Sequence, residues 1–228
     1  MVKMDKLIHC CYYLLAKNNY EMNYTKLIKL LYLADRESYR DTLHTMTGDI
    51  LTNMDKGPVL SKLLELIRNR SLPKDKSDQD YWDSFVEKVG FNIIAKDRSL
   101  IIDKLTRYEM QLLDKLDNKF KNYGYDEMIE YCHNYENCPE WEPPNGSSEP
   151  IDHKVLLAHL GKTPEEIDWI IKENEAFEEE EKLFLVSVDP FYSERNMAAI
   201  DEAAERIKLG CGVVKTMEEL EAMQGTNN

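Results

Sequence analysis

Long apolar runs are missing from this sequence, and so is an apolar leader at its N-terminus. No window approaches the roughly twenty consecutive apolar residues of a membrane span, and residues 1–5 open no apolar core long enough for a signal peptide. We therefore expect a cytoplasmic protein without a membrane partner. The five cysteines are odd in number and follow no regular spacing, which favours reduced thiols over a disulfide framework.

Basic residues are also in short supply. The chain has 29 lysines and arginines against 43 aspartates and glutamates, which gives a formal net charge of -14 at pH 7. A surface of this sign repels the nucleic-acid backbone, so we do not expect this chain alone to bind DNA or RNA. Basic residues between Lys26 and Arg40 leave a local basic face open, although such charges are more often simply solvated.

Motifs that carry catalysis or hold a metal are lacking as well. The five histidines are scattered, without a Gly-x-Ser-x-Gly, a phosphate-binding glycine loop or a His-Glu-x-x-His. Cys132, His133 and Cys138 form no C-x-x-C pair, and no second cluster completes four ligands. We expect a protein that is not an enzyme and has no cofactor and no metal. An acid–base site near Asp35, His44 or His133 is the enzymatic alternative.

Apolar residues at helical spacing predict a mainly α (α+β) fold, and the 43% hydrophobic fraction is ample for a packed core. Asn23 or Thr25 is suited to cap the second helix, and Pro58 to open the third. Thr106 with Glu109, and Thr163 with Glu166, form capping-box patterns. The predicted helices span residues 3–17, 25–40, 59–68, 77–89, 106–120, 126–133, 152–160 and 163–177.

Two segments of the chain do not have a helical pattern. Residues 91–95 and 100–105 are β-branched runs joined by the polar residues 96–99, which predicts a small β-hairpin. Residues 138–150 contain four prolines and a glycine, which predicts a long surface loop.

The composition changes towards the C-terminus. Four glutamates at 178–181 are typical of a solvated face or linker, and a β-like run follows at 183–188. We therefore predict a helical domain over residues 1–182 and an extension over 183–228. The extension is too short for its own core, so its apolar helix face either docks on the main domain or lies in a partner's groove. That face is formed by Met197, Ile200, Ala204 and Ile207.

Three motifs follow one another early in the chain: Tyr24-Thr-Lys-Leu-Ile-Lys-Leu-Leu-Tyr-Leu-Ala-Asp-Arg, then Thr47-Gly-Asp-Ile, then Lys56-Gly-Pro-Val. Their order resembles the Panacea domain, also called the SocA-like or phage-associated GepA-like family. With His133 and Pro139-Glu-Trp, the resemblance covers about residues 3–175. It implies a bacterial or phage antitoxin that neutralises a toxin encoded beside it. The residues that follow the family pattern are Lys26, Lys29, Tyr32, Asp35, Gly57 and Pro58.

A second set of motifs lies in the tail: Asp189-Pro-Phe-Tyr-Ser-Glu-Arg-Asn-Met, Ile207-Lys-Leu-Gly and Val213-Val-Lys-Thr-Met-Glu-Glu-Leu-Glu-Ala-Met. They are similar to the toxin-wrapping segment of RelB- and YefM-type antitoxins. This resemblance implies a small, basic partner of the RelE type, which cleaves messenger RNA. The residues expected to bind it are Phe191, Tyr192, Glu194, Asn196, Met197, Ile200, Ala204, Ile207, Val213, Val214, Met217 and Leu220.

The sequence is therefore compatible with three functions. The preferred one is an antitoxin that neutralises its toxin by direct binding. The second is an adaptor that delivers the toxin to a protease, or a regulator that represses the toxin's operon. The third is an unrecognised enzyme. The sequence leaves the oligomeric state open, a homodimer included.

Overall fold

A computed structural model describes residues 2–70, 76–144, 146, 148–188, 198 and 200–205 of the chain. The chain divides into two units, Met1–Asn174 and Glu175–Asn228. The division that the sequence predicts after residue 182 stays a prediction.

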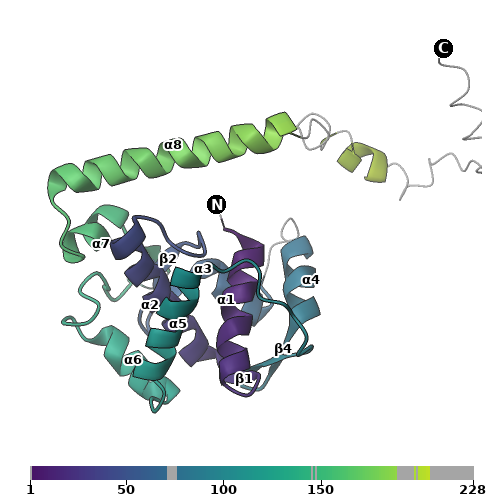
Figure 1. The fold of residues 1–228 in the computed structure, drawn as a ribbon, viewed down its shortest axis with the longest axis horizontal. Helices are drawn as coiled ribbons and strands as arrows, with labels where there is room; N and C mark the ends of the chain where they lie inside the picture. The colour runs from purple at the N-terminus through teal and green to yellow at the C-terminus, as the bar shows by residue number, and fades with distance from the viewer. Residues whose placement is uncertain are drawn as a thin grey trace, which may run out of the picture. The chain divides into compact units, whose positions relative to one another are not determined.

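Helices dominate the described residues, which confirms the mainly α (α+β) class (Figure 1). They are α1 (Met4–Lys17), α2 (Tyr24–Thr42), α3 (Ser61–Arg68), α4 (Lys76–Phe85), α5 (Arg107–Lys119), α6 (Tyr125–His133), α7 (His153–His159) and α8 (Pro164–Val188). The strands are β1 (Glu21–Asn23), β2 (Leu51–Asn53), β3 (Val59–Leu60), β4 (Val86–Val89), β5 (Asn92–Ala95) and β6 (Glu149–Pro150). They form two antiparallel three-stranded sheets, in the orders β1-β5-β4 and β3-β2-β6.

Helix α2 is the centre of the first unit. It packs against α1, α5, α6 and β3, and Figure 1 shows α1, α2 and α5 side by side. Leu27, Leu30 and Leu31 on this helix are completely buried, and each such side chain contributes about 1.5–3 kcal/mol of hydrophobic stabilisation. The helix begins where the sequence predicts, because the Asn23 side chain accepts hydrogen bonds from the N–H groups of Thr25 and Lys26.

Local capping also determines where α5 and α8 begin. In α5, the Thr106 hydroxyl accepts the N–H of Glu109 at 3.3 Å, and the Glu109 carboxylate accepts the N–H of Thr106 at 2.8 Å. Thr163 and Glu166 repeat the arrangement at the start of α8, at 3.3 and 2.8 Å. Each pair satisfies two donors that an α-helix leaves without partners at its start, so the predicted capping boxes are confirmed.

The predicted hairpin joins residues 91–95 to the wrong strand, because their partner is residues 86–89 and not residues 100–105. Strand β5 pairs with β4, from Val86 opposite Ala95 to Val89 opposite Asn92. The predicted helix over 77–89 therefore ends at Phe85. The other edge of β5 is taken by β1, so the β-branched run at 100–105 finds no free edge there and is not a strand.

The predicted place of Pro58 at the first position of a helix is also wrong. Val59 and Leu60 form β3, which pairs with Thr52 and Leu51 of β2, and α3 begins only at Ser61. The Asp49 carboxylate accepts the N–H groups of Lys62 and Leu63 at 2.9 and 3.0 Å, which satisfies the first-turn donors at this later start.

The predicted surface loop over 138–150 is partly wrong, because its first part is buried. Cys138 is 1% exposed and Glu140 is 2% exposed. Glu149 and Pro150 form β6 on the edge of β2. The exposed residues among the described part of the predicted loop are Glu142, Pro143, Gly146, Ser148, Glu149 and Pro150.

The predicted β-like run at 183–188 is helical, as the last turns of α8. Glutamate and lysine before it are good helix formers, and the helix continues through them. Residues 200–205 are also helical, with Ile200 37% exposed and Ala204 exposed. No helix among the described residues is long and apolar enough to cross a membrane. The predicted toxin contacts outside the described residues are Phe191, Tyr192, Glu194, Asn196, Met197, Ile207, Val213, Val214, Met217 and Leu220.

Candidate functional site

The family-pattern residues of α2 follow one another at intervals of three. A helix turns by about 100° per residue, so each step of three moves the side chain about 60° around the axis. The four side chains therefore face different neighbours, and the structure connects each one to a different part of the chain. These residues are Lys26, Lys29, Tyr32 and Asp35.

Lys26 holds the end of α5. Its ammonium donates to the carbonyl oxygens of Phe120, Lys121 and Tyr123 at 2.9, 3.2 and 2.8 Å. Carbonyls at a helix C-terminus lack partners within the helix, and a cation there also interacts favourably with the helix dipole. Burial lowers the pKa of Lys26.

Tyr32 and Arg36 hold the segment that follows α6. Both side chains donate to the carboxylate of Glu140, which is completely buried. Arg36 binds it with two nitrogens, at 2.7 and 3.1 Å, and paired contacts of this kind are strong and directional. Burial raises the pKa of the Tyr32 hydroxyl well above its usual range, with the Glu140 charge adding to the effect. Arg36 and Glu140 thus form an ion pair with a buried carboxylate, and Tyr32 adds a hydrogen bond to the same carboxylate.

Asp35 holds the loop after α2. Its carboxylate accepts the N–H groups of Met46 and Thr47 at 2.8 and 3.0 Å, and the Thr47 hydroxyl as well. Burial raises its pKa to about 7, although these hydrogen bonds oppose the shift. The side chain is 0% exposed. Three donors occupy the carboxylate and solvent does not reach it, so the geometry does not favour Asp35 as a catalytic acid or base.

Lys29, Gly57 and Pro58 lie together in the structure. The Lys29 ammonium donates to the carbonyl oxygen of Pro58 at 2.8 Å. Gly57 has φ +84°, and a Cβ on it would lie 2.9 Å from the Lys29 nitrogen and 3.0 Å from His133 Cδ2. Glycine is needed here for both its left-handed backbone and its missing side chain.

The environment of Lys29 is unusual for a charged group. Lys29 is 1% exposed, and burial lowers its pKa to about 8. No carboxylate among the described residues forms an ion pair with it. The His133 ring, which also lies close to Gly57, stacks on Trp141 at 4.3 Å and 15°. Its buried Nε2 atom has no hydrogen-bond partner among the described residues.

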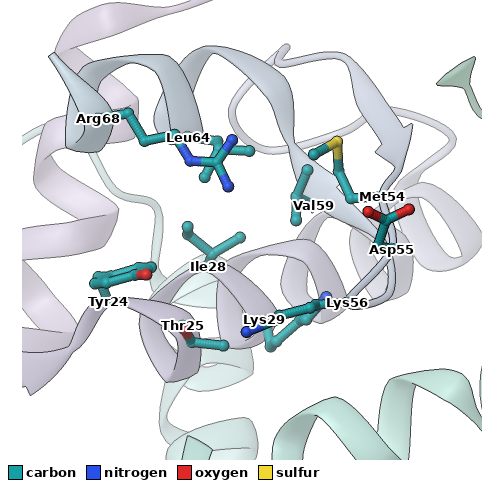
Figure 2. Close-up of a pocket in the computed structure, with 10 residues that line it drawn as sticks. All are labelled: Tyr24, Thr25, Ile28, Lys29, Met54, Asp55, Lys56, Val59, Leu64 and Arg68. Atoms are coloured by element: carbon teal, nitrogen blue, oxygen red, sulfur yellow. The ribbon is translucent and has the colours of Figure 1, made fainter. Parts of the chain in front are cut away.

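A pocket of about 200 Å³ opens beside Lys29, between α2 and the segment from Met54 to α3. Figure 2 shows Arg68 on one side of it, Lys29 on the opposite side and Ile28 between them. Its apolar lining includes Ile28, Met54, Val59 and Leu64, and its charged lining is Lys29, Lys56, Arg68 and Asp55. The pocket is thus apolar in its walls and mainly basic in its charges. Sequence reasoning missed it, because its two walls meet only in the folded chain.

Helix α8 is mainly acidic, in contrast to the basic pocket. It contains nine acidic and two basic residues, which gives -7 of the formal -14 of the chain. Large apolar side chains are exposed on it as well: Trp169 is 54% exposed and Leu183 is 69% exposed. An exposed element that is both acidic and apolar is suited to bind a basic protein surface.

Comparison with known families gives one match. The family described as Antitoxin SocA-like, Panacea domain, matches residues 27–142, about half of the 228 residues. The matched range begins in α2 and ends just after Trp141, so it includes most of the contacts around α2 and most of the pocket. Neither the curated proteins nor the solved structures give a match. The chain belongs to the SocA-like antitoxin family and contains its Panacea domain.

Proposed function

We propose that this protein is an antitoxin that neutralises a cognate toxin by direct binding and without catalysis. The observation that carries the proposal is the Panacea-domain match over residues 27–142. The buried carboxylates of this domain support a binding role, because Asp35 and Glu140 are occupied in holding neighbouring segments against α2.

The proposed partner is a small, basic, messenger-RNA-cleaving toxin of the RelE type. The resemblance of the tail to RelB- and YefM-type segments supports this choice, and so does the charge of the chain. Acidic side chains on α8 attract a basic partner and speed its encounter. Affinity comes mainly from buried apolar anchors. Among the described residues, the exposed apolar side chains of Trp169, Leu183 and Ile200 are available to become buried against the toxin.

The first experiment is growth rescue. The neighbouring gene is co-expressed with the full-length chain, and the proposal expects it to stop growth alone and to be harmless in the presence of this protein. The complex should then be recoverable intact. Loss of the toxin from the cell, in place of a stable complex, would favour the alternative of a proteolytic adaptor. A neighbour that is harmless when expressed alone would contradict the antitoxin proposal.

A second experiment tests the contribution of α8. Four exposed glutamates on this helix are changed to glutamine, and the association rate with the purified toxin is measured at low and high salt. We expect a loss of about tenfold or more at low salt that shrinks at high salt, because exposed charges mainly steer association. The four changes are Glu173→Gln, Glu175→Gln, Glu179→Gln and Glu180→Gln.

The matched control removes the same four charges from exposed positions elsewhere: Asp80→Asn, Glu87→Gln, Glu130→Gln and Glu136→Gln. Both variants have the same net charge, so only the place of the lost charges differs. Equal association rates for the two variants would show that α8 does not guide the toxin. A chain that ends at Val188 then tests whether the predicted tail residues are needed for rescue.

A further inference from the structure

The pocket beside Lys29 is a local basic site on an acidic protein. Lys29, Lys56 and Arg68 line it, against the single acidic side chain of Asp55, while the whole chain has a formal charge of -14. Among the described residues, none of these three basic side chains forms an ion pair. Lys56 and Arg68 are exposed at the pocket. The site therefore has positive charge that the protein itself does not neutralise.

The buried ammonium of Lys29 is the group in the pocket that most lacks a hydrogen-bond acceptor. An ammonium has three donors, and the structure gives this one a single acceptor, the carbonyl oxygen of Pro58. Burying a charge without a counter-ion is costly unless a partner compensates it. The pKa of about 8 still leaves most of the group protonated at neutral pH. The nearby groups that act on its charge are the thiols of Cys132 and Cys138, and neither is a carboxylate.

The walls of the pocket limit what fits between these charges. Ile28, Val59 and Leu64 supply apolar surface, and Figure 2 shows Arg68 and Lys29 on either side of Ile28. The Tyr24 ring also lines the pocket and stacks on Phe91 with ring centres 6.2 Å apart. A volume of about 200 Å³ is smaller than a typical drug-sized site. It suits one aromatic or branched side chain together with a charged group.

We propose that this pocket is a binding site for a small amphipathic carboxylate, with the carboxylate between Lys29 and Arg68 and the apolar group against Ile28 and Val59. The same chemistry is offered by a free aromatic or branched-chain acid and by the C-terminal residue of a partner protein. Binding of the anion supplies the acceptor that Lys29 lacks, and it removes apolar surface from water.

The test uses the full-length protein and three probes in calorimetric or ligand-observed NMR titrations. The probes are 3-phenylpropionate, its neutral analogue 3-phenylpropionamide, and acetate, which has the charge without the ring. We expect 3-phenylpropionate to bind at millimolar concentration or below. The amide and acetate should each bind about tenfold or more weakly, because each lacks one of the two interactions.

Two variants locate the binding. Lys29→Met keeps an unbranched side chain of nearly the same length and removes the charge, and Arg68→Met removes the charge of the other pocket-lining residue. Both should weaken 3-phenylpropionate by about tenfold while the amide is unaffected. If Lys29→Met does not fold, Arg68→Met still tests where the probe binds. The Arg68 side chain is exposed, so its replacement should leave the fold intact. Arg70→Met is the matched control, because Arg70 is exposed and does not line the pocket.

Absence of 3-phenylpropionate binding, equal binding of all three probes, or undiminished binding by both pocket variants would each overturn the proposal. The source of the natural carboxylate follows from repeating the titration with the toxin bound. Loss of probe binding in the complex identifies a residue of the toxin as the occupant. Unchanged binding identifies a free small acid. The titration of the chain alone needs no toxin, so it stands or fails independently of the antitoxin proposal.

Discussion

Gly57→Ala should destabilise this protein far more than an ordinary glycine substitution. Gly57 has φ +84°, where an L-residue costs roughly 1–2 kcal/mol. The new Cβ would also lie 2.9 Å from the Lys29 nitrogen and 3.0 Å from His133. Moving Lys29 weakens its hydrogen bond to Pro58, and a hydrogen bond to a charged group contributes about 1.5–3 kcal/mol. The expected loss in free energy of unfolding is therefore about 2.5–5 kcal/mol.

Gly161→Ala is the matched control for this change. Gly161 has almost the same φ, +85°, but a Cβ there has no neighbour within 4 Å. It should therefore lose only the backbone term of roughly 1–2 kcal/mol. The measurement is urea-induced unfolding of both variants beside the unchanged protein, followed by circular dichroism. Equal losses for the two variants would show that Lys29 and His133 do not restrict the space at Gly57, and the reasoning would be wrong.

Two further predictions concern the buried carboxylates. Glu140→Gln leaves the largely buried Arg36, whose side chain is 12% exposed, without its counter-ion, so it should cost about 3 kcal/mol in urea unfolding, whereas exposed Glu136→Gln should change little. Asp35 has a pKa of about 7 in the folded protein, above the roughly 3.9 of an unfolded chain. The folded state then binds the proton more tightly, so the Asp35 contribution to stability is complete below about pH 4 and falls as the pH rises to about 7. Asp35→Asn should flatten that part of the stability profile, and an unchanged profile would contradict the assigned pKa.

The sequence identified the family-pattern residues but not what they do. Lys26, Tyr32 and Asp35 could be named from the motif, yet each contacts a segment outside α2. The hydrogen bond from Tyr32 to Glu140 joins residues 108 positions apart. Since spacing along a helix says which face a side chain is on and not what lies opposite, their roles came only from the packed structure.

The pocket shows the same limit. Lys29 and Arg68 belong to different helices, and no local pattern predicts that they line one cavity. Its nearest sequence signal was the Gly-Pro pair, whose left-handed glycine allows the close approach of Lys29. The predicted toxin-binding residues of the tail, apart from Ile200 and Ala204, lie outside the described residues and stay predictions.

By itself, the sequence determined the helical class and the start of several helices. Asn23, the Thr106–Glu109 pair and the Thr163–Glu166 pair act within three residues, so their effect can be read from the chain directly. Tertiary structure decided which strand pairs with β5 and where α3 begins. It also decided that Glu140 is buried. Glu140 is buried by partners more than 100 positions away in sequence. Strand pairing, even between strands that are neighbours in sequence, depends on which edges meet when the chain folds.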